Sequence, residues 1–168
     1  AAPSGPAQNA ANFCVSTDMF VEGVHFRRSY FAPADIGHKA LAAAASDLAG
    51  MGAEPLGFAL SLMLPGDLAD DFLDQMLAGM AELSGRLGLP LIGGDLSRGP
   101  VLALDVVVFG RPGPTGRLLK RGQARPGDAL LLEPPALGWP VDMVRTCAVL
   151  VRDGWLPVLA HPERKYFR

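Results

Sequence analysis

The strongest constraint on the fold is a helical pattern between residues 67 and 87 that lies between two apolar runs. Its apolar side chains recur every three or four residues and form one stripe, made of Leu68, Phe72, Met76, Met80, Leu83 and Leu87. We expect Asp67 or a neighbour to cap the first turn of this helix. Residues 55–64 before it and 89–92 after it are apolar and are predicted to be strands. This arrangement favours a helix packed on a sheet.

The rest of the first two thirds of the chain repeats this alternation. A second helix is predicted over residues 35–50, where apolar residues again follow a helical rhythm. Residues 13–17 are predicted to form a short strand that ends on Asp18, and residues 19–27 a second strand or bent ribbon. Residues 101–109 form a long apolar strand. We therefore predict an α+β fold, a mixed sheet covered on one face by two main helices.

The last part of the chain is predicted to be a separate segment. Residues 110–127 are rich in Gly, Pro, Arg and Lys and are interpreted as a loop or linker. A strand, a helix and a final strand are expected after it, at residues 129–133, 141–152 and 156–160. We divide the chain into a first domain over residues 1–128 and a β-α-β segment over residues 129–168.

Composition excludes several classes of function. Charged residues make up 19% of the chain and the net charge is −2, without the basic stripe of a nucleic-acid binder. The two cysteines have no CxxC spacing, which argues against a zinc site or a disulfide framework and favours a reduced, cytoplasmic setting. No apolar run approaches the length of a membrane span, and no signal peptide is recognised.

Three aspartates at predicted element edges are the candidate chemical groups. Asp18 follows Ser16-Thr17, Asp47 follows Ser46, and Asp95 follows Gly93-Gly94. Several carboxylates from separate elements suit Mg²⁺, a hard cation that keeps sites for water and phosphate. The alternative is that each aspartate caps a helix or lies in a solvated turn. Neither the P-loop nor the dinucleotide-binding glycine pattern is present. The residue pattern alone therefore indicates metal-assisted phosphate chemistry and no more specific reaction.

Four collinear motifs carry a family resemblance. They are Val-Ser-Thr-Asp-Met-Phe-Val-Glu-Gly-Val-His-Phe (residues 15–26), the run from Lys39 through Ser-Asp-Leu-Ala-Gly-Met-Gly-Ala (46–53), Gly93-Gly94-Asp95, and Arg-Gly-Gln-Ala-Arg-Pro-Gly-Asp (121–128). In order and spacing they resemble the bacterial thiamine-monophosphate kinases, of the aminoimidazole ribonucleotide synthetase-like superfamily. The resemblance covers about residues 13–130.

The resemblance implies an activity. This family phosphorylates thiamine monophosphate to thiamine diphosphate, with ATP as co-substrate and Mg²⁺ between the phosphates, by direct transfer. The resemblance further implies a homodimer in which two copies of this domain pair across the sheet.

The resemblance also implies roles for individual residues. The Mg²⁺ ligands would be Ser16, Thr17, Asp18, Asp47 and Asp95, with Asp47 and Asp95 in the catalytic centre. Gly94, Asp95 and Arg121 would contact the nucleotide, and His25 would lie near the thiamine phosphate. Without the motif, His25 could be a hydrogen-bonded edge residue and Arg121 a solvated loop charge.

Two departures from the family leave other functions open. No Gly-Asp-Asp metal motif precedes Asn12, and the family's second α/β domain has no counterpart. Residues 130–168 resemble instead a fragment of polymerase-and-histidinol-phosphatase-type tyrosine phosphatases, in which His161 would match a metal ligand. This resemblance implies a different ancestry for the segment over residues 129–168. The alternatives are therefore a metal-dependent phosphatase fragment, or a catalytically inactive nucleotide-binding or dimerisation module.

Overall fold

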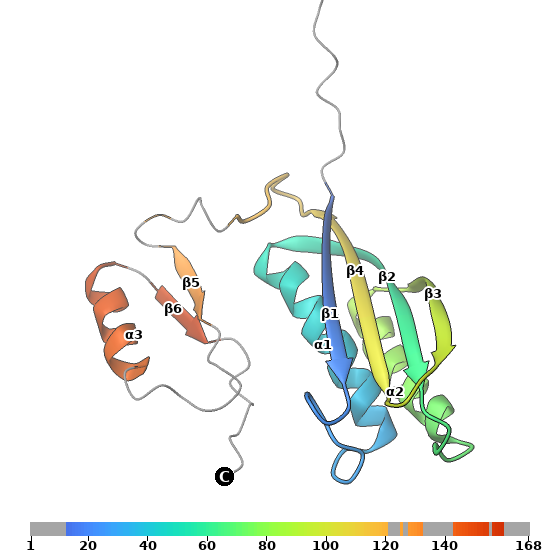
Figure 1. The fold of residues 1–168 in the computed structure, drawn as a ribbon. Coiled ribbons are helices and arrows are strands. Elements are labelled where there is room, and N and C mark those ends of the chain that lie inside the picture. The colour runs from blue at the N-terminus through green and yellow to red at the C-terminus, as the bar shows by residue number, and fades with distance from the viewer. Residues whose placement is uncertain (1–12, 121–124, 126–127, 133–142, 155, 160–168) are drawn as a thin grey trace, which may run out of the picture. The chain divides into compact units, whose positions relative to one another are not determined.

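The chain divides into two units, Ala1–Leu118 and Leu119–Arg168 (Figure 1). The structure is a computed structural model, which describes residues 13–120, 125, 128–132, 143–154 and 156–159. The division comes before residue 128, the boundary predicted from the sequence. Each unit is described by itself.

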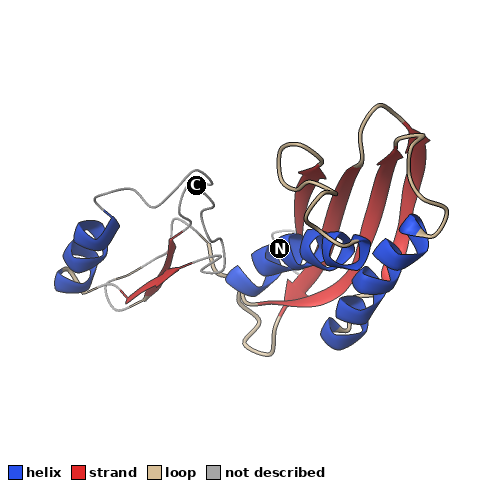
Figure 2. Ribbon diagram, turned by 90° about the horizontal axis from the view of Figure 1, so that it is seen from below, coloured by secondary structure: helices blue, strands red, loops and turns tan. Residues whose placement is uncertain are grey.

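A four-stranded sheet with two helices on one face makes up the first unit (Figure 2). Its elements in chain order are β1 (Cys14–Val21), α1 (Pro33–Gly50), β2 (Ala53–Leu64), α2 (Phe72–Leu87), β3 (Leu91–Arg98) and β4 (Ala103–Pro112). The strand order is β1-β4-β2-β3. β2 pairs in parallel with β3, and β4 pairs antiparallel with both β1 and β2. The predicted α+β fold is confirmed.

The core lies between the sheet and the helices because side chains alternate between the two faces of each strand. In the central strand β4, Leu104, Val106 and Val108 are completely buried. They meet the apolar stripes of α1 and α2, in which Leu41 and Met76 have no exposed surface.

The two helices approach each other closely through glycines. A Cβ on Gly37 of α1 would overlap the carbonyl oxygen of Met76, and a Cβ on Gly79 of α2 would overlap the backbone of Ala34. The helix backbones therefore touch at a distance that only glycine permits.

The second unit contains β5 (Ala129–Leu132), α3 (Met143–Arg152) and β6 (Leu156–Leu159). β5 and β6 pair in parallel. The predicted strand, helix and strand are confirmed to within two residues, whereas a separate ancestry for this segment stays a prediction.

Two predicted strand ends are wrong, because strands continue through residues that looked like stops. β1 runs past Asp18 to Val21, so residues 19–27 do not form a second strand. The chain turns there instead, with Gly23 at φ 82° and an isolated bridge between Glu22 and Phe26. β3 runs through the Gly93-Gly94 pair because it stays paired with β2, which places Asp95 inside a strand.

The predicted helix over residues 67–87 begins at Phe72, with Asp71 at the N-cap position but without a capping side-chain hydrogen bond. Asp67 lies in the loop before the helix and pairs with Arg28. In the part of the chain that the structure describes, no helix is long and apolar enough to cross a membrane.

Candidate active site

The centre of the candidate site is a contact between two of the sequence motifs. Ser16 lies on β1, on the face toward the helices, and its hydroxyl donates a short hydrogen bond to Asp47 Oδ2 near the end of α1. Asp18 occupies the same face of β1, two residues further along. Ser46 does not join them, since its hydroxyl donates to the carbonyl oxygen of Ala43 at 2.7 Å. The fold therefore brings the Ser-Thr-Asp and Ser-Asp motifs together.

Thr17 belongs to the opposite face of the sheet. Its hydroxyl donates to Asp105 Oδ1 at 2.7 Å, across the β1–β4 pair. Thr17 and Ser16 therefore face different surroundings, although both were predicted as ligands of one site. Sequence reasoning did not select Asp105 as a site residue, yet a signal existed, because it is the single charge in the predicted strand 101–109.

Gly94 and Asp95 lie on β3, at one edge of the sheet. A Cβ on Gly94 would overlap the carbonyl oxygen of Leu60 on β2, so close strand pairing requires glycine at this position. The Asp95 carboxylate is exposed and accepts a hydrogen bond from the Ser97 hydroxyl at 3.1 Å. Among the described residues, no side-chain hydrogen bond joins Asp95 to Ser16 or Asp47, and the register places Asp95 beside Ser61 instead.

His25 lies in the turn after β1 and is exposed. Its Nδ1 accepts a hydrogen bond from the backbone N–H of Val21 at 3.0 Å, and its ring stacks on Phe20 with centroids 5.7 Å apart. His25 is hydrogen-bonded, as the alternative considered from the sequence expected, but it lies in a turn and not on a strand. Its substrate role stays a prediction.

A network of opposite charges closes the same turn. Arg28 Nε donates to Glu22 Oε1 at 2.7 Å, and its Nη2 donates to Asp67 Oδ2 at 3.1 Å. The hydrogen bond from Arg28 holds the pKa of the Asp67 carboxyl below its ordinary value of 3.8. The bonds to Glu22 and then Asp67 raise the pKa of Arg28 in turn. Both residues are outside the recognised motifs: sequence reasoning assigned no role to Arg28, and it assigned Asp67 to a helix cap and not to this ion pair.

The oxygen chemistry around Asp47 fits a hard cation. Ser16, Asp18 and Asp47 offer hydroxyl and carboxylate oxygens, which are the ligand types that Mg²⁺ prefers. Among the described residues, however, no three side chains of Asp, Glu, His or Cys gather as a metal site. Mg²⁺ is commonly held by one or two carboxylates and completed by water and phosphate oxygens, so the donors present match that mode.

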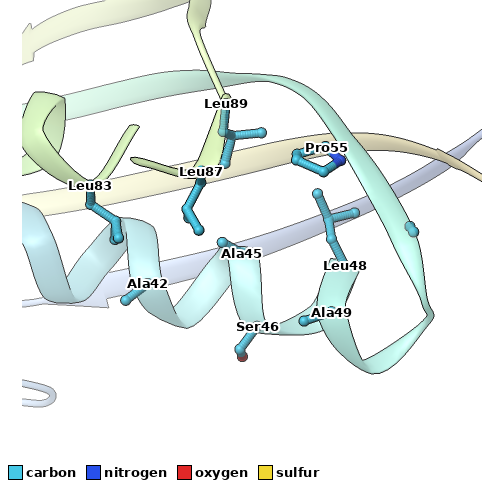
Figure 3. A pocket seen from close by; sticks show the side chains of 10 residues that line it. Ala42, Ala45, Ser46, Leu48, Ala49, Pro55, Leu83, Leu87 and Leu89 are labelled. Carbon is cyan, nitrogen blue, oxygen red and sulfur yellow. The ribbon is translucent and has the colours of Figure 1, made fainter. Parts of the chain in front are cut away.

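A cavity of about 310 Å³ opens beside this region, between the ends of α1 and α2 and the start of β2 (Figure 3). Its wall is formed by Ala42, Ala45, Ser46, Leu48, Ala49, Ala53, Pro55, Leu83, Leu87 and Leu89. Ser46 supplies its one polar side chain, so the cavity lacks the charges that a phosphate group needs.

Two residues assigned from the sequence cannot be placed. Arg121, predicted to contact the nucleotide, lies outside the described residues, and so does His161. Their roles stay predictions.

Comparison with known proteins identifies the family. Residues 6–111 match the model of the AIR synthase related protein, N-terminal domain. The chain belongs to this family.

Several relatives share most of this chain. A thiamine-monophosphate kinase of Synechococcus elongatus is 44% identical over 117 residues, which are 70% of this chain and 36% of the relative. The thiamine-monophosphate kinase of Escherichia coli K12 is 39% identical over 136 residues, 81% of this chain and 39% of the relative. The chain thus spans well under half the length of these curated relatives.

Solved structures show the same fold. The thiamine-monophosphate kinase from Stenotrophomonas maltophilia K279a has a TM-score of 0.62 at 38% identity, covering 73% of this chain and 37% of that one. The structure of AaThiL complexed with AMPPCP and TMP has a TM-score of 0.63 at 30% identity, covering 68% and 36%. A hydrogenase maturation protein HypE, at 21% identity and a TM-score of 0.59, shares the fold alone. These comparisons do not support a phosphatase resemblance for residues 130–168.

Proposed function

We propose that this chain carries the nucleotide- and metal-binding half of a kinase that phosphorylates thiamine monophosphate to thiamine diphosphate with ATP. The observation that carries the proposal is the contact between Ser16 and Asp47, which come from separate motifs 31 residues apart. It occurs in a chain whose relatives are thiamine-monophosphate kinases. The proposed transfer is direct, so the protein contributes chiefly position and charge neutralisation.

The proposed metal ligands are Ser16, Asp18 and Asp47, with Thr17 and Asp95 as the further residues that the family resemblance suggests. Bound Mg²⁺ would neutralise the phosphate charge and orient the phosphates. Asp47 holds the Ser16 hydroxyl in place, and Asp18 adds a carboxylate on the same strand face.

On the nucleotide side we propose Gly94, Asp95 and Arg121. Gly94 is proposed on the family resemblance, since the carbonyl oxygen of Leu60 fills the space that its side chain would take. Asp95 places a carboxylate beside it, on an exposed edge strand. His25 is proposed to contact the phosphate of thiamine monophosphate, because its exposed imidazole can donate through Nε2 while Nδ1 is engaged.

A second copy of this chain is the proposed partner. The sheet face opposite the helices carries exposed apolar side chains, including Val15, Met19 and Met63. Such a patch is typical of an interface. Cys14 and Cys147 are both free, which fits the reduced cytoplasmic setting proposed from the sequence.

Calorimetric titration with AMPPCP, first in Mg²⁺ and then in EDTA, tests the proposal. We expect binding that requires Mg²⁺ and that Asp47→Asn weakens about tenfold or more. Asp74→Asn removes the same charge from an exposed position on α2 and serves as the control. Absence of binding at millimolar AMPPCP, or equal binding in EDTA, would contradict the metal–nucleotide site.

A turnover assay separates the kinase from an inactive nucleotide-binding module. Formation of thiamine diphosphate from ATP and thiamine monophosphate supports the kinase. Mg²⁺-dependent AMPPCP binding without any product would favour the inactive module.

A further inference from the structure

The turn that carries His25 is closed on itself by backbone hydrogen bonds. The N–H groups of Val24 and His25 both donate to the carbonyl oxygen of Val21, at 3.2 and 2.8 Å. Gly23 N–H donates to Phe26 O at 2.8 Å, and Phe26 is 1% exposed. The buried Phe26 ring therefore anchors the turn, while residues 23–25 of the turn are exposed to solvent.

The imidazole of His25 is fixed at two points. Nδ1 accepts from the N–H of Val21, and Phe20 stacks on the ring at an interplanar angle of 24°. An Nδ1 that accepts a hydrogen bond carries no proton, so the neutral ring has its proton on Nε2. Within the described residues no protein atom accepts from this Nε2–H. The exposed end of the ring is thus a donor held ready for a ligand.

Arg28 joins this turn to a distant loop. Its Nε bonds Glu22, at the start of the turn, and its Nη2 bonds Asp67, in the loop between β2 and α2. The side chains of Arg28 and Glu22 are only 27% and 20% exposed. Water therefore screens this ion pair less than the ion pair between Arg28 and Asp67, whose side chain is 68% exposed. Both contacts of Arg28 are charge-assisted hydrogen bonds, which are stronger than hydrogen bonds between neutral groups.

We propose that Arg28 is a positioning residue that, by joining Glu22 to Asp67, holds the His25 turn so that Nε2–H is directed to the phosphate of a phosphate monoester. Fixing one tautomer and one ring orientation removes the cost of ordering the donor when the ligand binds. The identity of that ligand as thiamine monophosphate rests on the proposed function, whereas the positioning of His25 does not.

The first test needs no ligand. Nitrogen NMR of the imidazole ring is expected to show the Nε2–H tautomer of His25 in the unchanged chain. Arg28→Ala should release the turn and mix the two tautomers. Arg27→Ala is the matched control, because it removes the same charge from an exposed adjacent residue and should leave the His25 signals in place.

A second variant covers the case in which Arg28→Ala does not fold. Asp67→Asn alters only the exposed contact between Arg28 and residue 67. It should shift the His25 signals in the same direction as Arg28→Ala, but by a smaller amount. Unchanged His25 tautomers in Asp67→Asn and in a folded Arg28→Ala chain would overturn the proposal.

A double-mutant cycle then tests the link to the ligand. With AMPPCP and Mg²⁺ present, His25→Ala and Arg28→Ala should each weaken binding of thiamine monophosphate by roughly tenfold, the typical effect of one charge-assisted hydrogen bond. The double variant should be no weaker than His25→Ala, because Arg28 acts through that ring. Additive losses would show that Arg28 acts independently and would overturn the proposal.

The failure of the proposed function is recognised separately. If the unchanged chain binds neither Mg–AMPPCP nor thiamine monophosphate, the kinase assignment fails, and the NMR experiment alone decides whether Arg28 positions His25. We expect Arg28→Ala to change the affinity for Mg–AMPPCP by less than about twofold, since Arg28 makes no contact with Ser16 or Asp47.

Discussion

The ion pair between Arg28 and Asp67 should make the stability of the turn depend on pH. Arg28 lowers the pKa of Asp67 in the folded protein below 3.8, so the pair contributes stability above that pH. The contribution is lost as the pH falls through the lowered folded-state value. The exposed position of Asp67 keeps the effect small, and added salt should reduce it further.

Thermal unfolding of the unchanged chain and of Asp67→Asn between pH 7 and pH 3 measures this effect. We expect Asp67→Asn to be less stable at neutral pH and the gap to narrow below about pH 4. Glu82→Gln, exposed in the middle of α2 and away from the helix ends, should show no such gap. A difference that stays constant down to pH 3 would show that the charge of Asp67 is not responsible.

At single positions, the sequence identified residue types better than their orientation. Ser16, Asp18 and Asp47 were named as candidates from the sequence, and the fold brings Ser16 to Asp47, while their roles stay predictions. The opposite orientation of Thr17 follows from strand alternation, but only once β1 is known to continue through it. Arg28 could not be found from spacing, because its partner Asp67 is 39 residues away.

Helix packing gives the clearest prediction at the level of elements. Gly79→Ala should push α2 away from α1, because the new Cβ would overlap the backbone of Ala34, which cannot move aside as a side chain can. Overpacking of this kind costs about 1–3 kcal/mol. Urea unfolding would measure the loss.

Gly85→Ala is the matched control on the same helix. Its Cβ would meet nothing within 4 Å, so the higher helix propensity of alanine should add about 0.5–1 kcal/mol of stability. A similar loss in both variants would mean that the contact between α1 and α2 does not require glycine.

The order and type of the elements followed from periodicity, whereas two strand ends did not. The Gly93-Gly94 pair indicated a turn, yet β3 continues because it pairs with β2 along its length. Pairing with a neighbouring strand is a tertiary effect that local composition does not reveal. The same applies to Asp18. It lies inside β1 because the pairing between β1 and β4 continues through the residues before and after Asp18.

For the whole molecule, the apolar sheet face of the first unit, opposite its own two helices, predicts self-association. Met19 is 60% exposed on β1, an edge strand of the sheet, and it pairs in register with Asp105 of β4. We expect the chain to sediment as a dimer at micromolar concentration and Met19→Lys to shift it to a monomer.

Leu87→Lys is the control for this experiment. Leu87 is also exposed, at 41%, but it belongs to a helix on the other side of the sheet. Dissociation by both substitutions, or a monomer at every concentration without them, would contradict an interface on the open face.

The position of β4 in the sheet has a consequence for folding during synthesis on the ribosome. β4 is the last strand of the first unit to be synthesised, yet it lies between β1 and β2, which do not pair with each other. β1 therefore has no strand to pair with until β4 has been synthesised. Thr17 and Asp105, which form a hydrogen bond between these two strands, are 88 residues apart in the chain. During that interval the apolar side chains of β1 have no neighbouring strand, and unpaired strands with exposed apolar surface are prone to aggregate. A slow stretch of translation just after β4 leaves the ribosome would give the sheet time to close.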